Sequence, residues 1–183
     1  MRRFLLSCAI LAALMLPAVA IARAHGSGKP GFLVVREARG DGGVNGHAVV
    51  TLVVHGFVLG SVKPQNQARV DIYQVPSRGS QGPQAVAGPT GDLSKPRAVE
   101  WHTKGHTIAG TEFNGSGYRF YAPDGYYRVV VRGSGVYLFA GGQGNVKLHG
   151  SSFDPRTDGT YAIDGRTARS LPTRKLRLTI GRG

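Results

Sequence analysis

Two histidines, His102 and His106, are the first residues whose spacing could support chemistry, because only three residues separate them. A three-residue loop with Gly105 in the left-handed conformation would place the two imidazoles side by side on one face. A two-residue turn at Lys104-Gly105 would instead pair Thr103 with His106 and put His102 on the opposite face. Adjacent imidazoles can bind zinc or copper, but no third ligand follows at a known spacing. The pattern therefore favours polar residues of an exposed hairpin over a metal site.

His25 suggests a different metal chemistry. If a signal sequence is removed after Ala24, the mature chain begins at His25, whose amine and imidazole together could chelate copper. That arrangement resembles the histidine-brace copper proteins, a group that includes oxidative polysaccharide-cleaving enzymes. The resemblance implies a second histidine ligand, for which the eligible residues are His102, His106 and His149. A mature chain without cysteine departs from those enzymes, which usually carry disulfides. We therefore expect no cofactor and keep copper as the alternative.

Arginines and aromatic residues form a second candidate site. Aromatic residues concentrate between positions 101 and 139, and arginines alternate with them. In a strand over 126–132, Tyr127, Val129 and Val131 would face inward while the arginines face outward. Exposed aromatic rings beside guanidinium groups can stack on sugar rings or polymers. The residues that this pattern predicts for an outward, ligand-binding face are Arg119, Tyr126, Arg128 and Arg132.

Hydrolytic and nucleotide-dependent activities find little support in the sequence. Only 10 acidic residues are present, and four of them stand in Asp-Gly pairs, where they favour turns rather than a catalytic carboxylate pair. No Gly-x-Ser-x-Gly elbow occurs, and no glycine-rich loop precedes a helix. The sequence thus predicts a non-catalytic protein and identifies no catalytic residues.

Charge and composition narrow the class of partner. The 183 residues include 23 basic and 10 acidic ones, for a net charge of +13, and 28 glycines without a fixed period. Hydrophobic residues make up 41% of the chain, enough to build a buried core. Such an excess of positive charge favours anionic partners. No nucleic-acid-binding motif accompanies it, so we expect an anionic polymer of the cell envelope as the partner rather than nucleic acid.

The first residues have the layout of an export signal. Arg2 and Arg3 precede an apolar stretch over 4–16, and small-residue cleavage sites follow at Ala20 and Ala24. Cleavage would remove the single cysteine, Cys8, and no later apolar run approaches a membrane span. We expect a signal peptide at 1–24, a flexible leader at 25–31 and one β domain at 32–183. The domain would carry a long Pro/Gly-rich loop at 76–98, and the protein would be secreted or associated with the cell envelope.

Hydrophobic periodicity predicts strands throughout the rest of the chain. Segments 47–62, 69–75, 118–122, 126–132 and 175–180 are rich in β-branched and aromatic residues or alternate with a period of two. The tripeptide at 123–125 and the glycines at 133–135 and 141–144 read as turns between strands, and Asp164-Gly165 is a strong hairpin signal. We therefore expect an all-β fold, an antiparallel β-sandwich or a partly closed barrel built from short hairpins.

The last third of the chain bears a partial resemblance to known sequences. The run from Tyr127 to Gly144, then Asp158-Gly159-Thr160-Tyr161 and Ser170-Leu171-Pro172, resembles uncharacterised secreted all-β proteins of high-GC bacteria. The resemblance implies an exported all-β domain and assigns no activity. The sequence as a whole predicts an exported cell-surface or extracellular protein that binds an anionic or carbohydrate envelope polymer, with a copper-binding protein using His25 as the alternative.

Overall fold

The computed structural model describes residues 29–75, 81–151 and 158–181, and all nine strands there form one antiparallel sheet that does not close into a barrel. In chain order the strands are β1 (Gly31–Arg39), β2 (Val50–Val62), β3 (Ala68–Val75), β4 (Gln84–Leu93), β5 (Arg97–Thr103), β6 (His106–Leu148), β7 (Thr160–Ile163), β8 (Arg169–Ser170) and β9 (Leu176–Ile180). One 3-10 turn, Gly43–Asn45, is the only helical element of the described residues. Among those residues, no helix has the length and apolar character needed to cross a membrane.

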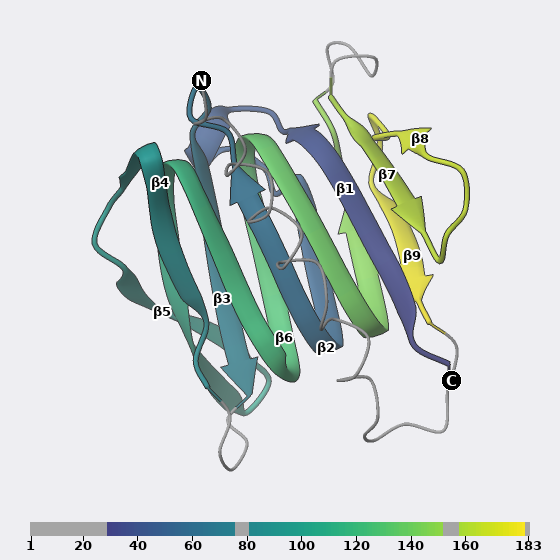
Figure 1. Cartoon of the computed structure of the whole chain (residues 1–183). Helices are drawn as coiled ribbons and strands as arrows, with labels where there is room; N and C mark the ends of the chain where they lie inside the picture. The colour runs from purple at the N-terminus through teal and green to yellow at the C-terminus, as the bar shows by residue number, and fades with distance from the viewer. Residues whose placement is uncertain (1–28, 76–80, 152–157, 182–183) are drawn as a thin grey trace, which may run out of the picture.

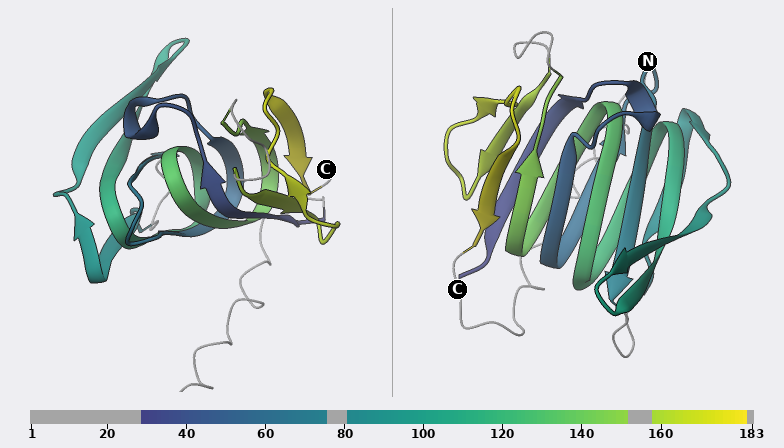
Figure 2. Two further views of the ribbon diagram at one scale, coloured as in Figure 1. Left: turned by 90° about the horizontal axis from the view of Figure 1, so that it is seen from above. Right: turned by 180° about the vertical axis from the view of Figure 1, so that it is seen from behind.

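The organising element is β6, a strand of 43 residues that coils. Val50 of β2 lies opposite both Val131 and Leu148, two positions of β6 that are 17 residues apart. Ala68 of β3 lies in the same way opposite Gly115 and Gly133. Each further step along β2 or β3 meets an earlier residue of β6, so the pairing is antiparallel. β2 and β3 therefore lie between successive turns of β6, as Figure 1 and the view from behind in Figure 2 show, and the view from above in Figure 2 shows β6 coiling around the interior.

The interior of this coil is the hydrophobic core. Side chains alternate between the two faces of each strand, so every second residue of β2, β3 and β6 points inward. Leu52, Ile72, Tyr127 and Leu148 are fully buried, as are many valines of the same strands. The predicted inward positions Tyr127, Val129 and Val131 are all buried, which confirms the alternation read from the sequence.

Rows of glycine bring neighbouring strands close together where the sheet bends. Four glycines stand opposite one another across four adjacent strand segments: Gly125, Gly56, Gly142 and Gly31. A Cβ added to Gly142 would lie 2.1 Å from the carbonyl oxygen of His55, and Gly142 has a φ of 135°. No other residue type satisfies both the space and the backbone conformation there. Part of the high glycine content thus serves the curvature of one long strand.

The architecture corrects the hairpin expectation. Chain reversals were expected at 123–125, 133–135 and 141–144, but all three lie inside β6. At the first of them, Ala122 pairs with Val58 and Gly125 with Gly56, so Pro123 and Asp124 form a bulge opposite Phe57. The strand bends there and continues in the same direction. The all-β, antiparallel class is therefore confirmed. The strands form one sheet and not the two sheets of a sandwich, the sheet does not close into a barrel, and one long strand replaces most of the expected short hairpins.

Two further local expectations have different outcomes. The segment 76–98, which the sequence predicted to be a Pro/Gly-rich loop, contains the strand β4 over Gln84–Leu93. The loop prediction is wrong for that part, and residues 76–80 lie outside the described residues. β4 pairs with β6 at Gln84–Ala87 and Asp92–Leu93, with a bulge between. The turn at Asp164-Gly165 is confirmed, because both residues have positive φ and the Arg166 amide donates a hydrogen bond to the Ile163 carbonyl oxygen at 2.9 Å. β7 and β8 pair only through Thr160–Ser170 and Tyr161–Arg169, so the strands do not pair directly beside the turn. The predicted signal peptide lies outside the described residues.

Candidate functional site

A groove crosses the outer face of the sheet between β1 and β4. It has a volume of about 880 Å³ and is lined by parts of β1, β2, β4 and two separate turns of β6. Strand pairing places its side chains in rows perpendicular to the strands. The first row is apolar: Val34 lies opposite Phe139, Phe139 opposite Leu59, and Leu59 opposite Tyr121. Gln84 of β4 lies opposite Tyr121 and ends this row.

A second row, two residues further along the strands, is polar and cationic. Ser61 lies opposite both Tyr137 and Arg119, and Arg119 lies opposite Val86 of β4. At the β1 end, the register shift between Val35 and Ala38 leaves Arg36 beside Tyr137. Arg36 and Arg119 therefore stand near opposite ends of the row, with hydroxyl groups between them.

The two arginines of the groove are not neutralised by neighbours. Among residues 29–75, 81–151 and 158–181, no aspartate, glutamate or histidine lines the groove. Both arginines are exposed, and within the described residues neither side chain makes a hydrogen bond or an ion pair. The groove is open as well, since Val86 is 69% exposed and Tyr121 38%. Its chemistry is that of an apolar strip with two available guanidinium groups alongside.

Glu37, the acid nearest this row, is already paired. Its Oε1 accepts hydrogen bonds from Lys63 Nζ at 2.5 Å and from the Tyr137 hydroxyl at 2.6 Å. The bond from Lys63, with a further contribution from Tyr137, holds the pKa of Glu37 below its usual value. Glu37 reaches these partners from a left-handed backbone conformation, φ 54°, at the β1 bulge. Lys63 thus balances the charge of Glu37, and the charge of Arg36 remains available.

Of the four residues predicted for an outward binding face, only Arg119 lines the groove. Tyr126 is 46% exposed and lies beside His55, with 6.5 Å between ring centroids. Arg128 lies over Trp101, with its guanidinium carbon 4.6 Å from the ring centroid, and contacts the ring of Tyr73 as well. Arg132 Nη1 contacts Asp71 Oδ2 at 2.7 Å. The structure therefore does not bring the four residues together into one site.

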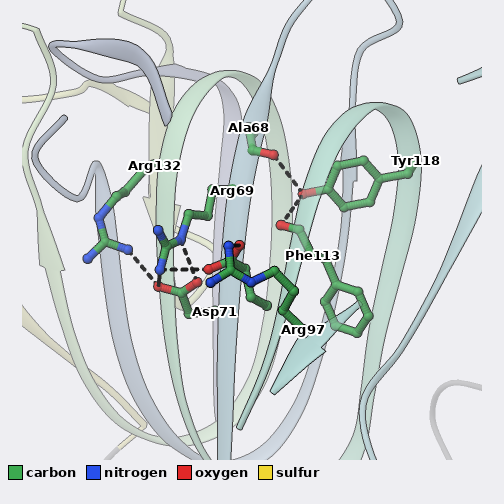
Figure 3. Close-up of polar contacts among 8 residues, drawn as sticks. Ala68, Arg69, Asp71, Arg97, Phe113, Tyr118 and Arg132 are labelled. Carbon is green, nitrogen blue, oxygen red and sulfur yellow. Dashed lines mark hydrogen bonds and ion pairs between the residues drawn. The ribbon is translucent and has the colours of Figure 1, made fainter. Parts of the chain in front are cut away.

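Arg132 belongs to an ion-pair cluster on the outer face of β3 and β6 (Figure 3). Asp71 and Glu112 are 1% and 5% exposed, so both carboxylates are buried. Arg69 contacts both of them, through Nε to Asp71 at 2.9 Å and through Nη2 to Glu112 at 2.8 Å. Arg97 Nη1 lies 3.9 Å from Glu112. Because Arg69 and Arg132 pair with buried carboxylates, this cluster joins β3 to β6.

The structure does not place His102 and His106 side by side. Thr103 pairs with His106 and His102 with Thr107, so the turn has two residues, Lys104-Gly105, and His102 and His106 point to opposite faces. The reading that placed them side by side is wrong. His102 contacts the Thr107 hydroxyl and Glu100 instead. No group of three or more metal-ligating side chains occurs within the described residues.

His25, the residue on which the copper alternative depends, lies outside the described residues. Of its suggested partners, His149 lies beside His47, with ring centroids 6.3 Å apart. The sequence had given no reason to pair these two, because they come together only through the contact of the segment before β2 with the end of β6.

Comparisons with models of protein families, with curated proteins and with solved structures gave no match. The groove must therefore be interpreted from its own residues.

Sequence reasoning missed most of the groove. Tyr121, Tyr137 and Phe139 fell within the aromatic-rich segment, but nothing local distinguished them from core residues. Nothing in the sequence indicated that Arg36 lines a groove, because its position there depends on the pairing of β1 with residues about 100 positions later in the chain.

Proposed function

We propose that the protein is a non-catalytic binding protein of the cell surface or extracellular space, and that its groove holds an anionic or carbohydrate polymer. One observation carries the proposal: two arginines, Arg36 and Arg119, line a groove to which the described part of the chain contributes no acidic residue and in which neither guanidinium has an ion-pair partner. A groove with uncompensated positive charge attracts anions, and the net charge of the chain adds a longer-range attraction.

The composition of the groove supports binding rather than catalysis. Its lining offers apolar and aromatic surface with few polar groups, which is typical of ligand sites. General acid–base chemistry ordinarily uses a carboxylate or an imidazole, and neither lines this groove. The described residues of the groove thus supply groups that can bind a ligand, and they supply no evident pair of side chains for proton transfer.

A binding assay with one matched control tests the proposal. The mature protein is titrated with an anionic polysaccharide at low and high ionic strength, together with Arg119→Ala and Lys147→Ala. Lys147 is exposed on β6 outside the groove, so both variants lose one positive charge.

The expected result is salt-sensitive binding that Arg119→Ala weakens roughly fivefold to tenfold, the value of about one charge-assisted contact. Lys147→Ala is expected to change the affinity less than about twofold. Equal losses in both variants, or binding that salt does not affect, would contradict the proposal.

A further inference from the structure

The spacing of Arg36 and Arg119 defines what the groove can hold. Three inter-strand steps separate them: from β1 to the 134–142 turn of β6, then to β2, then to the 119–131 turn of β6. Neighbouring strands lie about 4.8 Å apart, so the two main-chain positions are roughly 14 Å apart. A ligand chain with acidic groups repeated along this line can contact both guanidinium groups, one at each end of the row.

The apolar row runs between the same strands and parallel to the line that joins the arginines. Phe139, the second residue of the row, packs against two other rings: its ring centroid lies 5.7 Å from that of Phe32 and 5.6 Å from that of Phe57. Leu59 and Tyr121 continue the row toward β4 and are both more than a third exposed. A ligand that follows the arginines therefore also lies along a firm, flat apolar strip.

The openness of the groove discriminates between ligands with apolar parts. An acyl chain gains its binding energy by leaving water completely, and side chains as exposed as Val86 would leave much of it wet. Sugar rings, in contrast, pair one apolar face with hydroxyl groups that remain hydrated at the open side. A polysaccharide thus fits an open strip better than a lipid does.

We infer that the groove binds an acidic polysaccharide laid across the strands, with two acidic groups of one chain held by Arg36 and Arg119. A pyranose unit advances such a chain by roughly 5 Å at ordinary bond lengths. The two arginines therefore engage acidic groups about three sugar units apart, and the rings between them lie on Leu59, Phe139 and Tyr121. This inference rests on the proposed function, which requires only that the groove bind an anionic or carbohydrate polymer.

The test is the dependence of affinity on chain length. Galacturonic acid oligomers of roughly two to eight units are titrated by calorimetry into the wild type, Arg36→Ala and Lys147→Ala, with long polymer measured alongside. Oligomers too short to reach both arginines should bind weakly and alike. Those of about four units or more should bind roughly fivefold to tenfold more tightly, the same factor that Arg119→Ala removes, because the second contact becomes intramolecular. Arg36→Ala should abolish this step in affinity, and Lys147→Ala should preserve it.

The alternative outcomes separate the inference from the proposed function. Affinity that rises smoothly with length and keeps its form in Arg36→Ala would overturn the two-point inference while leaving binding of anionic polymer intact. Failure of every oligomer and of the long polymer to bind would overturn both. Equal binding of a neutral oligomer of the same length would overturn the assignment of an acidic ligand.

Discussion

Replacing Asp71 with asparagine should destabilise the fold, because Asp71 joins two arginines from different strands. Its carboxylate contacts Arg69 Nε at 2.9 Å and Arg132 Nη1 at 2.7 Å while its side chain is 1% exposed. Removing one partner of a buried ion pair costs about 3–5 kcal/mol. Both arginines retain about 30% exposure and can regain water, and asparagine keeps one acceptor oxygen. We therefore expect a loss of about 2 kcal/mol in the free energy of unfolding.

Urea unfolding at neutral pH measures this loss, followed both by far-UV circular dichroism and by the fluorescence of Trp101, the single tryptophan. The matched control is Asp92→Asn, which removes the same charge from an exposed position on β4. The expected difference of about 2 kcal/mol corresponds to a melting temperature lower by roughly 4–8 °C. A difference below about 0.5 kcal/mol between the two variants would refute the structural role assigned to the cluster.

Two other substitutions test the buried acid and the coil. Burial raises the pKa of Asp158 above its usual value, an effect that Ser151 partly offsets, so the folded protein holds this proton more tightly than the unfolded chain. The resulting stabilisation is complete below the unfolded pKa and is lost as pH rises through the folded pKa. The free energy of unfolding of Asp158→Asn, measured with urea, should therefore rise relative to that of the wild type as the pH is raised from about 4 to about 7. A difference between the two proteins that stays the same over this pH range would contradict the prediction. Gly142→Ala should cost more than about 3 kcal/mol or prevent folding, because its Cβ would lie 2.1 Å from the carbonyl oxygen of His55. The control Gly43→Ala shares a positive φ but meets nothing within 4 Å, so it should cost only about 1 kcal/mol; similar losses in both variants would argue against the close approach.

The sequence predicted the local elements better than their connection. Alternation correctly placed Tyr127, Val129 and Val131 inside, and Asp164-Gly165 correctly marked a turn. The segment Pro123-Asp124-Gly125 has the composition of a turn, but a bulge needs the same residues. Whether the chain reverses or only bends depends on the strands that flank it on both sides, and no local pattern contains that information.

The candidate site was predictable only in part for the same reason. Arg119 was identified from its place among aromatic residues, and it lines the groove. Arg128 and Arg132 do point away from the core, as alternation indicates, but Trp101, Tyr73 and Asp71 meet them there. Arg36 reaches the groove through pairing between distant segments, which one sequence does not reveal.

The most direct test of the proposed binding groove is a map of where an acidic oligosaccharide contacts the protein. An amide NMR titration with a galacturonic acid oligomer long enough to span the groove gives that map. The account predicts chemical-shift changes concentrated at Arg36, Leu59, Arg119, Tyr121 and Phe139, with little change around Lys147 and Arg177 on the β6–β9 pair. Changes spread evenly over the basic surface, or centred on Tyr126 and away from the groove, would contradict it.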